Sequence, residues 1–231
     1  NYFMLFYHLG KYVLLMKAAL KGPEKWSFYW KEIAREMVSI GVGSLGIISI
    51  ISVFMGAVTS VQTAFQLVSN LISPSVIGQI TRDNSILELS PTIGALVLAG
   101  KTGSNIASQI GTMRVTEQID ALEVMGVNSP GYLIMPKILA GVTMIPLLVI
   151  ISITLSIVGG MVAGSLSGAL TASEYVNGVQ SEFNNTMLVT GMVKSVVYAF
   201  IITSVSTYQG FYTSGGDLEV GEFSTRAAVL S

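Results

Sequence analysis

The sequence predicts an all-α bundle of membrane-spanning helices, and two observations lead to that fold class. Hydrophobic residues make up 51% of the 231 residues and charged residues only 11%, a composition typical of membrane proteins. No charged residue occurs from Met37 to Thr81 or from Ile138 to Ser173. Each interval exceeds the roughly 20 apolar residues that a helix needs to cross a bilayer. Cysteine is absent, which excludes disulfides and thiolate metal sites.

The first 36 residues predict a segment at the membrane surface. They carry half of the chain's twelve lysine and arginine residues and both tryptophans. These are Lys11, Lys17, Lys21, Lys25, Lys31 and Arg35, with Trp26 and Trp30. Aromatic and basic side chains together are typical of the lipid headgroup level. The segment is either an interfacial helix on the cytoplasmic leaflet or a basic tail that sets orientation, and both place the N-terminus inside.

The remaining residues, 37–231, predict the transmembrane bundle of a single domain that covers 1–231. Apolar runs indicate four spans, at about 38–68, 88–110, 132–167 and 186–209. We expect outer-side breaks at Ser73–Pro74 and at Arg82–Asn84, and an external segment at 171–185. A glycine-rich acidic loop, 215–222, is expected before Arg226. That residue would begin a fifth span that continues beyond Ser231.

Two of these spans carry small residues at every fourth position. The rows are Ala95, Ala99, Gly103, Ala107 and Gly111 in the second span, and Gly160, Gly164 and Gly168 in the third. Such rows let helix backbones approach closely inside a membrane. They serve either an interface between subunits or packing within one subunit, and the spacing fits both.

The segment Gly111–Gly126, between the second and third spans, predicts a short cytoplasmic helix. On a helical wheel Val115, Ile119, Leu122 and Met125 share one side, and Glu117, Asp120 and Glu123 share another. Thr116 is expected to cap the start of the helix and Gly126 to supply a left-handed exit. Periodicity alone also fits an ordinary interfacial helix with a solvated acidic face.

The amino-acid sequence of this segment resembles that of a known family. The run Gly-Thr-Met-Arg-Val-Thr-Glu-Gln-Ile-Asp-Ala-Leu-Glu-Val-Met-Gly follows Ala-Gly-Lys-Thr-Gly-Ser at 99–104 and precedes Pro136-Lys137. It is similar to the signature of the MlaE-type permeases, the membrane subunits of MCE-associated ABC transporters that move phospholipid. The resemblance extends from about Ile33 to the C-terminus.

This resemblance implies that the short helix is a coupling helix, which docks into a groove on a separate cytoplasmic ATPase subunit. The residues implied in ATPase coupling are Arg114, Thr116, Glu117, Gln118, Asp120, Ala121, Leu122, Glu123 and Met125. The family also implies a homodimer of this chain, an MCE-domain protein on the outer side, phospholipid as cargo and the bacterial inner membrane as location. The plastid inner envelope is the alternative location. A permease for another hydrophobic cargo such as sterol, or a membrane scaffold without transport, is the alternative function.

Catalytic and cofactor sites are not expected in this chain. Gly94 to Thr102 looks like a phosphate-binding loop, but five residues rather than four separate the two glycines, and the stretch is an apolar helix. His8 has no cysteine or acid at metal-ligand spacing, and no histidine accompanies the serine-rich patches as a base. ATP is therefore expected on the partner subunit. A net charge of −1 favours no nucleic-acid partner.

Two charged residues inside apparent spans predict an intramembrane ion pair. Glu88 begins the second span and Lys194 lies early in the fourth. Because the chain enters both of these spans from the outer side, the two residues are expected at a similar depth in the membrane. An unpaired charge at a helix centre costs roughly 2.5 to 3.5 kcal/mol. We expect the two to pair, and both positions match charged positions of the resembled family; the alternative is that each reaches the headgroups separately. Lys101 is expected to reach the cytoplasmic face.

The first span is expected to line a lipid pathway, as it does in the resembled family. Polar and bulky apolar side chains alternate along it: Phe54, Val58, Thr59, Gln62, Phe65 and Gln66. Such a mixture suits both the headgroup and the tails of a lipid. A glutamine in a membrane helix equally serves as a hydrogen-bond partner for a neighbouring helix.

Overall fold

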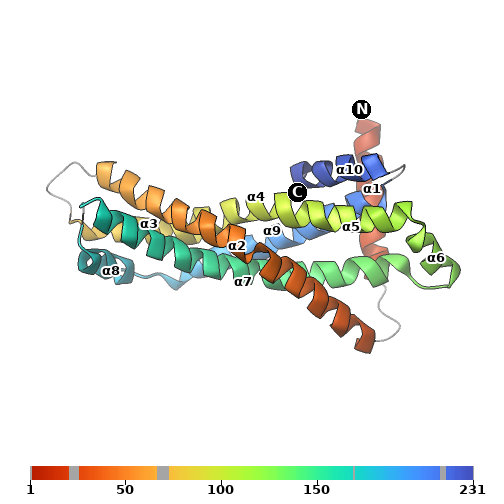
Figure 1. Ribbon diagram of the computed structural model, residues 1–231, viewed down its shortest axis with the longest axis horizontal. Coiled ribbons are helices and arrows are strands. Elements are labelled where there is room, and N and C mark those ends of the chain that lie inside the picture. The colour runs from red at the N-terminus through yellow and green to blue at the C-terminus, as the bar shows by residue number, and fades with distance from the viewer. Residues whose placement is uncertain (1, 21–25, 67–72, 169, 214–216, 231) are drawn as a thin grey trace. The chain divides into compact units, whose positions relative to one another are not determined.

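A computed structural model of the chain describes all residues except 1, 21–25, 67–72, 169, 214–216 and 231. Every regular element in these described ranges is a helix (Figure 1). In chain order they are α1 Tyr2–Ala19, α2 Trp26–Gln66, α3 Ser75–Asn84, η1 Ser85–Ile93, α4 Gly94–Leu98, η2 Ala99–Gly103, α5 Ser104–Val115, α6 Gln118–Val124, α7 Ser129–Leu166, α8 Ala172–Gln180, α9 Asn185–Phe211 and α10 Asp217–Leu230. The predicted all-α fold class is confirmed.

Three of the four predicted spans are single helices long and apolar enough to cross a membrane. They are Tyr29–Gln66 within α2, Ser129–Leu166 (α7) and Asn185–Phe211 (α9). The last two differ from the predicted spans by only a few residues. α2 begins at Trp26, well before residue 38. The predicted border between residues 36 and 37 therefore falls inside one continuous helix.

The second predicted span is helical but is not one α-helix. The π-helical segments η1 and η2 interrupt it, and α3 leads into η1 without a break. The expected outer-side break at Arg82–Asn84 is therefore wrong, because these residues form the last turn of α3. Pro91 lies inside η1. Proline has no N–H to donate and its ring crowds the preceding turn, which a locally wider turn relieves.

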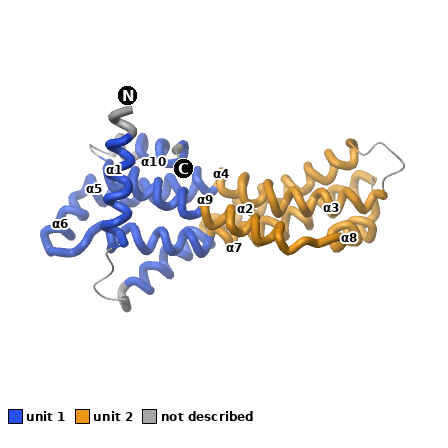
Figure 2. Tube along the Cα trace, turned by 180° about the vertical axis from the view of Figure 1, so that it is seen from behind, with its two compact units in different colours: residues 1–42, 98–144, 199–231 blue, residues 43–97, 145–198 orange. Residues whose placement is uncertain are grey.

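The chain forms two compact units, which Figure 2 colours separately. Unit 1 comprises residues 1–42, 98–144 and 199–231. In it α10 packs against α5 and η2, and Ser224 Oγ donates to the carbonyl of Ser104 at 3.0 Å. α1 contacts α9 through side chains: Tyr12 OH donates to Ser204 Oγ at 2.8 Å, and His8 Nδ1 lies 2.9 Å from Tyr208 OH. His8 thus has a protein partner rather than only solvent.

Unit 2 comprises residues 43–97 and 145–198. Here α2 and α7 touch backbone to backbone, because a Cβ on Gly56 would overlap the carbonyl of Ser156. Hydroxyl contacts join the same helices, with Ser52 Oγ donating to Ser152 Oγ at 2.7 Å. Backbone contact and hydroxyl hydrogen bonds are the two devices expected where lipid provides no hydrophobic drive between helices.

Both rows of small residues are used, at least in part, within one chain. Ala95, Ala99 and Ala107 of the second span are buried. In the third span a Cβ on Gly160 would meet Tyr175 and Thr81, and one on Gly164 would meet Ser60. The spacing fitted either an interface between subunits or packing within one subunit. The structure shows that these residues pack within one subunit.

The C-terminal part differs from the expected loop. α10 begins at Asp217, so residues 217–222 are helical and Arg226 lies inside the helix rather than opening one. Arg226 pairs with Glu222 at 2.7 Å across one turn, an arrangement that supports helix. Of the glycines in the expected loop, Gly215 and Gly216 lie outside the described residues and Gly221 lies within α10.

Candidate functional site

The predicted coupling segment is a short helix, α6, separated from α5 by a sharp turn (Figure 1). α5 ends at Val115, and Thr116 is its C-cap: the Thr116 hydroxyl donates back to the carbonyl of Thr112 at 2.7 Å. The expectation that Thr116 caps the start of the new helix is wrong. Glu117 occupies the N-cap with a left-handed φ of 58° and makes no side-chain cap bond. The turn therefore uses a backbone conformation that costs free energy for a residue other than glycine.

The exit of α6 follows the prediction. Gly126 has a φ of 79°, its N–H donates to the carbonyl of Glu123 at 3.0 Å, and the N–H of Val127 donates to the carbonyl of Leu122 at 3.1 Å. This pair of bonds is the Schellman motif. Ser129 Oγ also donates to Glu123 Oε1 at 2.7 Å, so α6 is attached to the first residue of α7.

One side chain of α6 is fully buried, and most of the others are exposed. Ile119 is fully buried, and Arg114 pairs with Asp120 at 2.6 Å while its guanidinium lies over the Phe211 ring at 5.9 Å. Of the predicted coupling residues, Thr116, Glu117, Gln118, Asp120, Ala121, Glu123 and Met125 are exposed, and Arg114 and Leu122 are half-buried.

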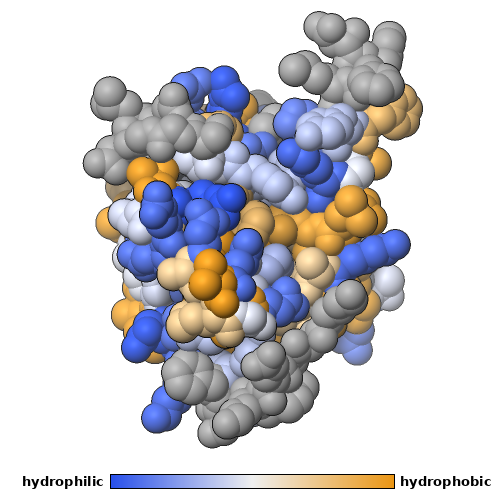
Figure 3. Space-filling view, turned by 90° about the vertical axis from the view of Figure 1, so that its right-hand side faces the viewer, coloured by the Kyte–Doolittle hydropathy of each residue, from blue (hydrophilic) through white to orange (hydrophobic). Residues whose placement is uncertain are grey.

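The tip of α6 presents two apolar side chains to the outside. Val124 is 88% exposed and Met125 68% exposed. Sequence reasoning did not select Val124, and it placed Met125 on the apolar side with Ile119. Figure 3, seen from the side on which α6 lies in Figure 1, shows hydrophobic residues set among hydrophilic ones. Adjacent exposed apolar side chains with charged neighbours are typical of a protein contact.

The predicted lipid-pathway residues lie on the exposed face of α2. A groove of about 590 Å³ runs along the end of this helix. Its lining is Ala57, Val58, Val61, Gln62, Phe65 and Gln66 of α2, with Ala163 of α7. Phe54 is exposed but outside the lining, and the Thr59 hydroxyl is bonded to the carbonyl of Met55 at 2.8 Å. An apolar groove with a few polar groups suits an amphipathic ligand.

Glu88 and Lys194 are brought together in unit 2. Lys194 Nζ lies 3.3 Å from Glu88 Oε1 and donates to the carbonyl of Leu87 at 3.0 Å. Both charges remain accessible, with the Glu88 side chain 65% exposed and that of Lys194 33% exposed. The pair therefore presents two opposite charges on the surface of the single chain.

A second ion pair, in unit 1, was missed by sequence reasoning. Lys137 of α7 donates to the carboxylate of Glu36 of α2 and to Gln109 Oε1 of α5 at 2.7 Å. The Glu36 and Lys137 side chains are only 10% and 6% exposed. Lys137 belongs to the stretch that resembles the known family, but its partner Glu36 is distant in sequence. Both residues lie near the ends of apolar runs, where a charge is ordinary.

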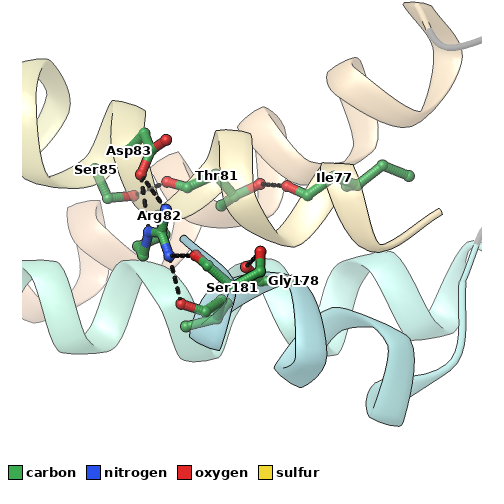
Figure 4. A network of polar contacts seen from close by, with 8 residues as sticks. Ile77, Thr81, Arg82, Asp83, Ser85, Gly178 and Ser181 are labelled. Atoms are coloured by element: carbon green, nitrogen blue, oxygen red, sulfur yellow. Dashed lines mark hydrogen bonds and ion pairs between the residues drawn. The ribbon is translucent and has the colours of Figure 1, made fainter. Parts of the chain in front are cut away.

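Arg82 is also buried, although it was expected as an outer-side basic residue. It is 2% exposed, and its Nη1 donates to the carbonyls of Val179 and Ser181 at 2.7 and 2.5 Å. Asp83 accepts from its Nε at 2.8 Å. Figure 4 shows Arg82 reaching from α3 to the end of α8. A cation on the last carbonyls of a helix satisfies groups that would otherwise lack donors.

α8 packs tightly on α3 beside this contact. Tyr175 is fully buried, and burial raises the pKa of its phenol to about 12. Thr171 and Glu174 form a capping box at the start of α8. The hydrogen bond from the Thr171 backbone N–H, and then that from its hydroxyl, lower the pKa of Glu174.

Together the fold and these sites define a class of protein: an all-α membrane subunit with a short, partly anchored helix exposed between two of its helices. Within the described ranges, no group of three or more histidine, cysteine and acidic residues could hold a metal ion. The model of the family described as Permease MlaE matches residues 33–231. The chain belongs to the MlaE permease family.

Relatives extend this assignment over almost the whole chain. A probable ABC transporter permease protein of Rickettsia bellii is 34% identical over 227 residues, which cover 96% of this chain and 86% of the relative. A probable ABC transporter permease protein of Synechocystis sp. is 34% identical over 85% of this chain and 74% of its own length. Protein TRIGALACTOSYLDIACYLGLYCEROL 1, chloroplastic, of Arabidopsis thaliana is 30% identical over 90% of this chain and 59% of its own length. The chain is thus a membrane-embedded ABC transporter permease, which works with an ATPase.

Proposed function

We propose that this chain, as a homodimer, moves phospholipid between its membrane and an MCE-domain protein on the outer side, driven by ATP hydrolysis on a separate subunit. The bacterial inner membrane is the proposed location. The observation that carries the proposal is the family match over residues 33–231. The name of the Arabidopsis thaliana relative refers to a diacylglycerol lipid, which supports a lipid as cargo.

The groove on α2 supports the choice of an amphipathic cargo. Its volume of about 590 Å³ is within the range of ligand sites, roughly 300 to 1,000 Å³. Val58, Val61 and Phe65 offer apolar surface for acyl chains, and Gln62 and Gln66 offer amide groups for polar atoms. A protein surface of this kind is expected to hold part of a lipid rather than a hydrophilic solute.

α6 supports the proposed contact with the ATPase. Its buried Ile119 and its contacts with Arg114 and Ser129 fix the helix to the bundle, while Val124 and Met125 face outward. A helix fixed at its base and apolar at its tip can transmit a displacement in either direction. In this proposal the chain itself carries no catalytic group, and ATP is bound by the partner subunit.

Lipid analysis of the purified complex tests the cargo. The chain is tagged, purified together with its ATPase, and the bound lipids are identified by mass spectrometry. Phospholipid retained by the complex and transferred between vesicles only in the presence of ATP is the expected result. Retention of sterol alone would replace phospholipid by the alternative cargo. The absence of any ATP-dependent lipid transfer would contradict the proposal.

A paired substitution at the tip of α6 tests the ATPase contact. Val124→Asp with Met125→Asp is expected to abolish co-purification of the ATPase, because two charges would be buried in an apolar contact. Val229→Asp is the matched control, since Val229 is similarly exposed, at 79%, on α10. The control should retain the ATPase. If the paired variant retains it equally well, α6 is not the contact.

A further inference from the structure

We propose that the buried network of Glu36, Lys137 and Gln109 is the mechanical link that passes movement of α6 to α2. The inference rests on the proposed role of α6 as the contact with the ATPase. It assigns these three residues as positioning residues for transport, which act through the helices that carry them rather than by touching cargo or nucleotide.

The network joins three helices at a single ammonium group. Lys137 of α7 donates to Glu36 of α2 and, at 2.7 Å, to Gln109 of α5. Gln109 Nε2 in turn lies 3.4 Å from Asn105 Oδ1 on its own helix. A lysine ammonium has three N–H groups to share, so one side chain can hold both neighbouring helices at once.

Two of the three helices are the ones that flank α6. α5 leads into α6, and Arg114 near its end is paired with Asp120 at 2.6 Å. α7 follows α6 in the chain, and the hydroxyl of its first residue, Ser129, donates a hydrogen bond to Glu123 at 2.7 Å. A displacement of α6 therefore acts on both α5 and α7 through side-chain contacts as well as through the backbone. The network connects these two helices to α2.

A buried charge pair is suited to keep the three helices together. The Glu36 and Lys137 side chains are 10% and 6% exposed. Sliding α2 away from α7 would leave the Glu36 carboxylate without its ammonium partner and the Lys137 ammonium without a counter-charge, which is strongly unfavourable in an apolar environment. A second contact holds the same helices, because Tyr29 OH donates to the carbonyl of Gly131 at 2.6 Å.

α2 continues from this contact to the proposed cargo groove. It is one helix from Trp26 to Gln66, so Glu36 and the groove residues Gln62 and Phe65 are carried by the same element. A movement imposed at Glu36 can thus reach the groove along a continuous helix, without a loop between the two. The network is the point at which α2 receives that movement.

The same helix provides a matched control. Glu32 also pairs with a basic residue, Arg35, at 3.1 Å, but this pair lies within α2 and the Arg35 side chain is 78% exposed. Removing the Glu32 charge alters the same chemistry on the same helix without separating α2 from α5 or α7. Glu32→Gln should therefore leave coupling unchanged, whereas Glu36→Gln should weaken it.

A fluorescent probe on α2 measures the link without reference to cargo. The chain contains no cysteine, so Ile50→Cys introduces a unique labelling site at a position that is 61% exposed and outside the groove. All variants carry this site and a bimane label whose emission depends on its surroundings. The complex with the ATPase is placed in vesicles, and the ATP-dependent change in emission is recorded with the rate of ATP hydrolysis.

The link predicts a selective loss. Glu36→Gln should retain the ATPase and its hydrolysis rate but reduce the ATP-dependent emission change by about threefold or more, the size of effect expected for a residue that carries coupling. Glu32→Gln should behave as the unaltered chain. Exchanging the charges, with Glu36→Lys and Lys137→Glu together, should restore at least half of the change.

Three outcomes would overturn the link. They are an unchanged signal in Glu36→Gln, the absence of any ATP-dependent signal in the unaltered chain, and a parallel loss of ATPase binding and signal that the charge exchange does not restore. The last result would indicate a purely structural role. If the unaltered chain shows the signal and Glu36→Gln loses it, but no phospholipid is transferred, the link stands and the proposed cargo is wrong.

Discussion

Two glutamate–lysine pairs in this permease have the same chemistry and opposite surroundings. In unit 1 the Glu36 and Lys137 side chains are 10% and 6% exposed, whereas in unit 2 those of Glu88 and Lys194 are 65% and 33% exposed. A buried pair is costly to break because each charge depends on the other. The exposed pair leaves both charges accessible from outside the chain. The buried charges of Glu36 and Lys137 therefore hold helices together, whereas the exposed charges of Glu88 and Lys194 can contact a ligand or a partner.

The largest expected effect is the loss of the buried carboxylate. Glu36→Ala should lower the free energy of unfolding by about 3 to 5 kcal/mol, because Lys137 would stay buried with only Gln109 as an identified partner. Glu88→Ala is the control and should cost less, because Lys194 is 33% exposed and keeps the carbonyl of Leu87 as a partner. Denaturant unfolding in detergent, followed by circular dichroism, measures both. Equal costs for the two variants would remove the distinction between the pairs.

Arg82 extends the comparison to a third buried charge. Arg82→Ala should lower the free energy of unfolding by about 3 kcal/mol, because the carbonyls of Val179 and Ser181 lose a charged donor. Hydrogen exchange of the α8 amides should increase with it. Arg82→Lys should recover only part of the stability, since an ammonium cannot reproduce the guanidinium fork. Unchanged exchange in α8 would show that Arg82 does not hold this helix.

A smaller loss of stability is expected at the start of α8, where the Thr171 hydroxyl caps the helix. Thr171→Ala should cost about 1 kcal/mol, the usual contribution of an N-cap hydroxyl, because the bond from the Glu174 N–H to Thr171 Oγ1, 3.3 Å long, is lost. Thermal unfolding in detergent measures this change. Wild-type stability in the variant would mean that water replaces the cap without loss.

The smallest effect depends on pH and belongs to Glu174 itself. Hydrogen bonds from the Thr171 N–H and hydroxyl lower the pKa of Glu174 from its ordinary value of 4.5. A lowered carboxyl pKa adds stability above the ordinary pKa, and that stability is lost as the pH falls through the folded-state value. Glu174→Gln should therefore be less stable than the wild type at pH 7, and the difference should shrink below pH 4.5. A constant difference would contradict the capping role of the charge.

The sequence predicted those parts of the fold that hydrophobic length alone decides. α7 and α9 were placed to within a few residues because their apolar runs have clear ends. The start of α2 was misplaced because aromatic and charged residues at 26–36 have the composition of an interfacial segment. The π-helical segments were not predicted, since the apolar pattern of 88–110 is compatible with either helix type.

The candidate site was predicted where a charge stands out from its surroundings. Glu88 and Lys194 interrupt apolar runs, so pairing could be expected before their distance was known. Glu36 and Lys137 lie near the ends of such runs, and only the packing of α2 against α7 reveals that they are buried. Thr116 was assigned to the wrong helix because a cap residue can serve the end of one helix as well as the start of the next.

In the proposed mechanism, force from the ATPase enters the permease at α6. Val124→Cys introduces a unique cysteine into this cysteine-free chain, at the most exposed apolar side chain of the segment. A short maleimide photocrosslinker attached there should join the permease to the ATPase subunit in the assembled complex, whereas the same label at Val229→Cys should not. If the cysteine at position 124 forms no crosslink and stays as reactive in the complex as in the isolated permease, the ATPase does not engage α6.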